Sequence, residues 1–123
     1  MISHVSIGVH EVEKAGHFYD AVLGALGYKK LYDSTEAIGY GDDFPKFWLM
    51  KAAHPVPANP ESGLHFCFEA KKRSDVDQFH AAALKASGKD NGKPGLRPDY
   101  GDNYYAAFVV DPEGYRIEAY CGR

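Results

Sequence analysis

Hydrophobic and polar side chains alternate along residues 2–9, a pattern that is typical of a strand with one buried face. The apolar side of this segment consists of Val5, Ile7 and Val9. Over residues 11–26 the apolar positions recur at helical spacing, and Gly27 follows where a helix C-cap is expected. Shorter β-like segments come next, at residues 28–33, 37–40 and 46–51. The first part of the chain therefore predicts a βαβββ unit.

The same order of elements begins again after a stretch that is rich in proline. Because proline fixes φ and has no N–H group, residues 54–62 are predicted to form an extended linker. The elements predicted beyond it are a strand at 63–70, a helix at 75–86, strands at 104–110 and 115–121, and between these strands a turn at 111–114. Residues 90–100 are rich in glycine and proline and are predicted to contain one short strand at most.

The two parts of the chain also match in sequence. When the chain is shifted by 61 residues, six of the 24 pairs from His4 to Gly27 are identical. Chance at average composition would give roughly one or two. The match aligns His4 with His65 and Gly27 with Gly88. A self-match at a fixed offset indicates an internal repeat, and two copies favour a closed pseudo-twofold arrangement over a solenoid.

We therefore predict an α+β fold, in which two tandem βαβββ modules form a cupped mixed sheet with the helices on its outer face. The length of 123 residues fits a single domain. Module 1 covers about residues 1–53, the linker covers 54–62, and module 2 covers about 63–123. Strands that curl around one concave face would bring the two starting strands close to each other.

Composition and charge exclude several classes of protein. The net charge is −3 and the charges are dispersed, unlike the clustered basic residues of a nucleic-acid-binding surface. The longest apolar run, 106–110, is far shorter than the ~20 residues that span a bilayer, and residues 1–4 do not resemble a signal peptide. Cys67 and Cys121 fit free thiols better than a disulfide. We expect a cytoplasmic protein that binds neither nucleic acid nor a membrane.

Strand alternation places three potential metal ligands on the face opposite the helices. His4 and His65 lie at the start of equivalent strands, and alternation with core positions leaves Glu118 on the same concave side. Two imidazoles and one carboxylate suit Zn, Ni, Fe, Mn or Co, and such a set with open positions is a known catalytic arrangement. Each residue alone also has a structural explanation. The repeat that equates the two histidines favours contact with a metal or a substrate.

These residues, together with Asp-Pro-Glu-Gly-Tyr-Arg-Ile-Glu at 111–118, resemble the vicinal oxygen chelate superfamily. That group includes glyoxalase I, bleomycin-resistance proteins, fosfomycin-resistance enzymes and extradiol dioxygenases. The resemblance covers nearly the whole chain. It implies paired βαβββ modules around a cupped sheet, a divalent metal held by His4, His65 and Glu118, a small-molecule substrate and often a homodimer. It does not point to one activity.

Superfamily members with four protein ligands carry the remaining ligand on the fourth strand. Aligning residues 114–118 with 44–48 puts Trp48 in that position, and an indole cannot ligate a metal. The resemblance therefore implies a site with three protein ligands, as in the dioxygenases and fosfomycin-resistance enzymes, or a site that has lost its metal.

The second module is longer than the first. The separation from His65 to Glu118 is 53 residues, whereas that from His4 to Trp48 is 44, so the second module holds nine extra residues. We assign them to residues 91–103, which are predicted to form a loop at the rim of the pocket, where specificity is often determined.

Five residues are predicted to contact a substrate. Arg97 is expected to meet an anionic group and Tyr100 to stack or donate a hydrogen bond, although an exposed surface loop explains both equally well. Trp48 and Tyr105, together with Tyr40 and Tyr104, are expected to line an apolar pocket, an assignment that competes with ordinary core packing. Cys67 shares the face of His65, but a nucleophilic thiol would also need an oriented base.

The sequence supports two main hypotheses of function. The first is a divalent-metal-dependent enzyme that acts on a small oxygenated molecule as a lyase, isomerase, transferase or dioxygenase. The alternative is a metal-free protein that sequesters a small ligand in the same cup, as bleomycin-resistance proteins do. The His/His/Glu set favours the enzyme, and Trp48 favours the binding protein. A third hypothesis, an interaction module that uses its sheet edges, has less support.

Overall fold

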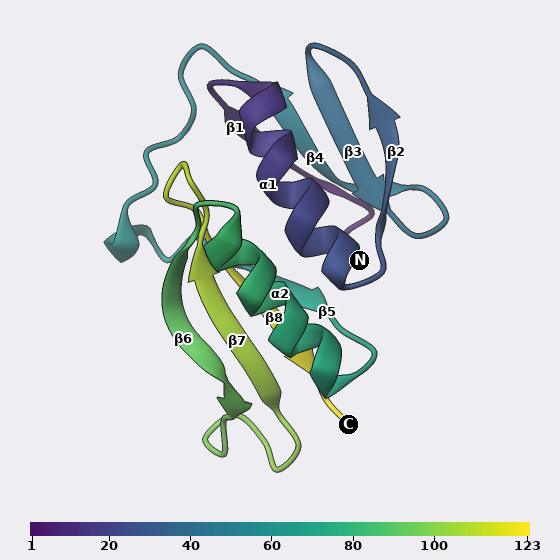
Figure 1. Cartoon of the computed structure of the whole chain (residues 1–123). Coiled ribbons are helices and arrows are strands. Elements are labelled where there is room, and N and C mark those ends of the chain that lie inside the picture. The colour runs from purple at the N-terminus through teal and green to yellow at the C-terminus, as the bar shows by residue number, and fades with distance from the viewer.

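The computed structural model describes all of residues 1–123 and contains two βαβββ modules in tandem (Figure 1). The first module consists of β1 (Val5–Val9), α1 (Val12–Ala25), β2 (Lys29–Asp33), β3 (Ala37–Gly41) and β4 (Pro45–Lys51). The second consists of β5 (Phe66–Glu69), α2 (Arg73–Lys85), β6 (Lys89–Leu96), β7 (Tyr105–Val110) and β8 (Arg116–Cys121). The predicted α+β class and the two βαβββ modules are confirmed. Neither helix has the length and apolar character needed to cross a membrane.

Each module folds into a four-stranded mixed sheet of its own, with the orders β1-β4-β3-β2 and β5-β8-β7-β6. In each sheet the first strand of the module runs parallel to the last, and the other neighbours are antiparallel. No hydrogen-bonded strand pairing joins the two sheets within one chain. The strands β1 and β5 are therefore open edges at equivalent positions in the two modules.

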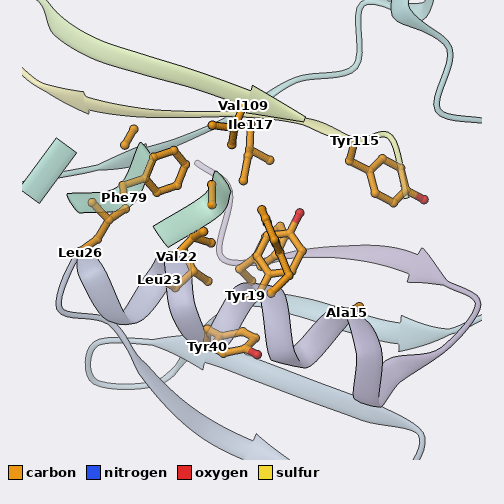
Figure 2. Close-up of a cluster of buried hydrophobic side chains, with 14 of the residues drawn as sticks. Ala15, Tyr19, Val22, Leu23, Leu26, Tyr40, Phe79, Val109, Tyr115 and Ile117 are labelled. Carbon is orange, nitrogen blue, oxygen red and sulfur yellow. The ribbon is translucent and has the colours of Figure 1, made fainter. Parts of the chain in front are cut away.

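The helices α1 and α2 pack against each other between the two sheets (Figure 2). The core contains 23 buried residues from both modules, among them Tyr19 and Val22 of α1, Phe79 of α2 and Ile117 of β8. Each helix covers one face of its own sheet. The faces that carry His4 and His65 are the opposite ones, so within one chain they point away from each other. The two starting strands form no hydrogen-bonded ladder with each other in one chain, although Val5 of β1 lines the same cavity as Phe66 and Phe68 of β5.

The strand β6 is longer than the composition of residues 90–100 predicts. Its pairing with β7 is irregular, with register shifts on both sides of Gly92. Bulges of this kind accommodate glycine, and an edge strand tolerates Pro94 because its missing N–H group need not join the ladder. Residues 54–62, predicted as an extended linker, contain no strand and end in one 3-10 turn at Pro60–Ser62.

The turn at residues 111–114 fastens the second module to the first. Asp111 is 4 % exposed, and one of its carboxylate oxygens accepts a hydrogen bond of 2.6 Å from the Tyr19 hydroxyl of α1. Its other oxygen accepts the backbone N–H groups of Glu113 and Tyr115. The Tyr115 hydroxyl in turn donates to the backbone carbonyl of Gly8. This buried polar network connects the two modules and fixes their relative position.

Candidate functional site

The side chains of His65 and Glu118 meet on the face of the second sheet that no helix covers. The Nε2 atom of His65 lies 2.8 Å from Oε1 of Glu118, and the Tyr104 hydroxyl donates to Oε2 over 2.6 Å. The parallel pairing of β5 with β8 sets this geometry, because it places Cys67 opposite Glu118 and leaves His65 beside it. Glu118 is 4 % exposed, so both of its oxygens are held in defined positions.

A cavity of about 470 Å³ opens over this pair, and we name it the His65 pocket. It is lined by His65, Asn91, Tyr100, Tyr104, Phe108, Arg116 and Glu118. The ring of Phe108 lies 5.9 Å from that of His65, and Tyr100 packs edge-on against Tyr104. The pocket therefore combines two aromatic walls with a floor of ionisable groups.

The thiol of Cys67 lies beside this pair and is protonated at neutral pH. Burial, followed by the negative charge of Glu118, raises its pKa to about 12. A thiol is a weak nucleophile compared with its thiolate. Cys67 thus lies beside Glu118 but outside the lining of the His65 pocket, in a state suited to packing rather than to attack on a substrate.

His4 and Trp48 share a second cavity, of about 560 Å³, on the exposed face of the first sheet. It is lined by His4, Ser6, Tyr32, Ala37, Pro45, Trp48 and Met50, and we name it the Trp48 pocket. Trp48 pairs with Ser6, two residues after His4, just as Glu118 pairs with Cys67, two residues after His65. The strand register therefore supports the equivalence of Trp48 and Glu118 that is expected from the alignment of the two modules.

One chain brings together two of the three predicted metal ligands. His65 and Glu118 are in contact, whereas His4 is exposed and lines the Trp48 pocket instead. No group of three or more His, Cys, Asp or Glu side chains in the chain is arranged to hold a metal ion. The reason is the packing of the two helices between the sheets, which turns the two concave faces outward.

The predicted substrate-binding residues are divided among several places. Tyr100 lies at the His65 pocket and is 66 % exposed. The guanidinium of Arg97 donates to the backbone carbonyl of Lys93 and lies over the Phe108 ring, outside the lining of the pocket. Tyr105 points to the helix-covered face, where its hydroxyl donates to Asp77 of α2.

Strand parity explains both the misplaced tyrosine and the residues that sequence reasoning missed. Neighbouring residues of a strand point to opposite faces, so Tyr104 occupies the pocket and Tyr105 does not. Phe108 of β7 pairs directly with Glu118 of β8, and Arg116 precedes Glu118 by two residues in β8, so both share its face. The same parity that selects Glu118 also selects Arg116, whereas Asn91 belongs to an irregular strand that gives no such signal.

Gly39 creates the space that the Trp48 ring occupies. A Cβ atom at this position would lie 2.9 Å from Cζ3 of Trp48 and 3.0 Å from Cβ of Pro45. We expect Gly39→Ala to tilt the indole and lower the free energy of unfolding by about 1–2 kcal/mol. The chain has one tryptophan, so a shift in its fluorescence emission reports the displacement directly.

The matched control for this variant is Gly24→Ala in α1. A Cβ atom added to this glycine would have no neighbouring atom within 4 Å. Because alanine restricts the unfolded chain and favours helix, we expect a gain of about 0.5–1 kcal/mol and unchanged emission. Chemical unfolding followed by Trp48 fluorescence measures both variants. Equal effects of the two substitutions would contradict the role assigned to Gly39.

The family model of the Glyoxalase/Bleomycin resistance protein/Dioxygenase superfamily matches the sequence over residues 1–119. The chain belongs to this superfamily. The match covers both modules, including the turn at residues 111–114 and Glu118 of β8. It agrees with the order βαβββ in each half.

Individual proteins that resemble this chain support its assignment to the superfamily. A glyoxalase/bleomycin resistance protein from Albidiferax ferrireducens is 30% identical, with a TM-score of 0.80 over 97% of this chain and 96% of the other. The uncharacterized protein YqjT of Bacillus subtilis is 29% identical over 94% of both chains. The fosfomycin resistance protein FosX of Listeria monocytogenes shares the fold at 12% identity, with a TM-score of 0.71 over 100% of this chain and 93% of its own.

Proposed function

We propose that this protein is a divalent-metal-dependent enzyme that acts on a small oxygenated molecule in the His65 pocket. The contact between His65 and Glu118 carries the proposal. A histidine and a carboxylate lie 2.8 Å apart in a partly open cavity on the sheet face where the superfamily resemblance expects a metal. This pair lines a cavity with aromatic walls, which a salt bridge that only stabilises the fold does not require.

The donor set of this pair supplies two of the three ligands of a facial 2-His-1-carboxylate site. Imidazole nitrogen and carboxylate oxygen suit Zn, Ni, Fe, Mn or Co. The Tyr104 hydroxyl fixes Oε2 of Glu118 and thereby orients the carboxylate, as outer hydrogen bonds commonly do for metal ligands. A bound metal would act as a Lewis acid that polarises a substrate oxygen or lowers the pKa of a bound water.

The third ligand in this proposal is His4 of a second copy of the chain. The strands β1 and β5 are open edges. His4 directly precedes β1, whereas His65 directly precedes β5, which pairs with the strand of Glu118. Pairing β1 of one copy with β5 of the other would join two four-stranded sheets into one cup and satisfy the free backbone groups of both edges. A twofold dimer built in this way contains two identical composite sites.

The residues around the pair have distinct roles in this proposal. Phe108, Tyr100 and Tyr104 form aromatic walls that restrict access of water to the substrate. Trp48 of the second copy closes the cup from the opposite sheet, where its position corresponds to that of Glu118. With three protein ligands, open coordination positions remain for substrate oxygens, which accords with lyase, isomerase, transferase or dioxygenase chemistry.

A second candidate function is the metal-free binding of a small ligand, and Trp48 favours it. An indole in the position equivalent to Glu118 removes one potential ligand and offers a flat apolar surface, which Tyr32 extends at a ring distance of 5.4 Å. In this alternative the cup sequesters its ligand by packing, and the two histidines are polar lining residues.

Titration of chelator-treated protein with Mn²⁺, Zn²⁺, Ni²⁺ or Co²⁺ in a calorimeter separates the two functions. We expect one ion per chain for at least one of these metals, and a loss of affinity of about 100-fold or more in His65→Ala, because a ligand contributes at least as much as its outer partners. His10→Ala is the matched control, since His10 pairs with Glu113 outside the cup. Equal binding by the two variants, or no binding by the wild type, would support the metal-free alternative.

A further inference from the structure

Arg116 is an unpaired cation in the lining of the His65 pocket. It stands at the start of β8, two residues before Glu118, and therefore shares its face of the sheet. The side chain is partly buried and forms an ion pair with no carboxylate of the chain. A guanidinium that faces a cavity without a partner is a ready binding group for a planar oxyanion, which it can hold through two parallel hydrogen bonds.

The one carboxylate of the pocket, Glu118, is engaged by other groups and forms no ion pair with Arg116. Oε1 of Glu118 is engaged by His65 and Oε2 by the Tyr104 hydroxyl. No other lining residue carries a negative charge, and Asn91 adds an amide that can donate a further hydrogen bond. The guanidinium of Arg116 thus stays without a carboxylate partner and lies in the same lining as an amide donor.

The walls of the pocket are suited to a flat apolar group beside that anion. Phe108 presents its ring within the pocket at 5.9 Å from His65, with an angle of 33° between the two planes. Tyr104 continues this surface and stacks on Tyr120 at 4.2 Å, while Tyr100 flanks it at 5.2 Å. Aromatic rings favour offset-stacked or edge-on contacts with another ring at such distances.

We propose that the His65 pocket recognises a small aromatic carboxylate, with its carboxylate on Arg116 and its ring against Phe108. This inference rests on the proposed function in that it concerns the same cavity, and it adds the substrate class. It replaces Arg97 by Arg116 as the group that selects an anion. Arg97 is committed elsewhere, because its guanidinium donates to the Lys93 carbonyl at 2.6 Å and covers Phe108 at 5.3 Å.

The proposal is tested with salicylate and salicylamide, two probes of nearly equal shape that differ in charge. Calorimetric titration uses chelator-treated full-length protein, so that metal binding does not contribute. We expect wild type to bind salicylate about tenfold more tightly than salicylamide, the difference that a charge-assisted hydrogen-bonded pair typically supplies. In Arg116→Gln the two probes should bind equally, with the salicylamide affinity unchanged, and Arg116→Lys should retain part of the preference.

The matched control is Arg97→Gln, which removes a neighbouring guanidinium from outside the pocket lining. It should keep the full preference for salicylate, and thermal unfolding of each variant checks that the fold is intact. Equal affinity of wild type for the two probes, no binding of either, or loss of the preference in Arg97→Gln rather than Arg116→Gln would overturn the proposal. Because the titration is metal-free, a preference for salicylate that depends on Arg116 supports this inference even if the protein binds no metal. If the protein binds metal but shows no such preference, this inference fails and the proposed function stands.

Discussion

A mixture of His4→Ala chains and Glu118→Gln chains is expected to recover about one quarter of the metal sites of the wild-type dimer, although neither variant alone binds metal tightly. The reason is the separation of the ligands in one chain. His65 and Glu118 line one pocket and His4 lines another on the opposite side of the helix layer. In the proposed dimer each site takes His4 from one copy and the other two ligands from its neighbour.

The fraction follows from the symmetry of the pair. Random exchange makes about half of the dimers heterodimers, and each heterodimer contains one site in which all three ligands are intact. Subunits are exchanged by joint refolding of the two variants, and bound metal is measured by elemental analysis after gel filtration. The size of the dimer peak shows at the same time whether the chains associate.

The control mixture combines His65→Ala with Glu118→Gln. Both substitutions damage the same half of the site, so every dimer of this mixture contains only incomplete sites, and no recovery is expected. Recovery in the control mixture as well, or its absence in both, contradicts a composite site. A wild-type chain that binds metal as a monomer contradicts the arrangement outright, because His4 would then have to reach Glu118 within one chain.

The part of the site that parity controls could be predicted from the sequence, and the part that depends on module packing could not. Alternation along single strands is a local property, and it placed His65, Cys67 and Glu118 on one face of one sheet. The position of His4 depends on how two finished modules pack, which the hydrophobic pattern does not encode, because each helix has an apolar face whichever way the modules turn.

Errors at single residues arose where the local pattern is ambiguous. Tyr104 and Tyr105 are adjacent tyrosines, and a shift of one residue in a strand exchanges the two faces. The pocket tyrosine is Tyr104, which precedes the first residue of β7. The sequence predicts β6 too short, because its glycines and proline are typical of a loop, whereas the ladder accommodates them in bulges at an open edge.

Removal of the Asp111 carboxylate in Asp111→Ala is expected to lower the free energy of unfolding by about 3 kcal/mol, which is a large share of the stability of a small domain. The substitution leaves the fully buried Tyr19 hydroxyl without its acceptor and frees the N–H groups of Glu113 and Tyr115. Asp111→Asn should cost much less, because its amide oxygen can accept both N–H groups and its NH₂ group can donate to the Tyr19 oxygen. Urea unfolding followed by Trp48 fluorescence measures both variants.

Comparing how the stability of the wild type and of Asp111→Asn depends on pH isolates the ionisation of Asp111. Burial raises the pKa of the Asp111 carboxyl above its ordinary value of 3.8, against the opposing hydrogen bond from Tyr19. A raised pKa means that the folded state binds its proton more readily than the unfolded state, so the stabilisation is present at low pH and is lost as the pH rises through the folded pKa. Asp111→Asn cannot titrate there. The wild type should therefore gain stability relative to Asp111→Asn when urea unfolding is compared at pH 7 and then at pH 4. Other carboxyl groups cancel in this difference, so a relative loss of stability would show that hydrogen bonding, rather than burial, dominates the pKa of Asp111.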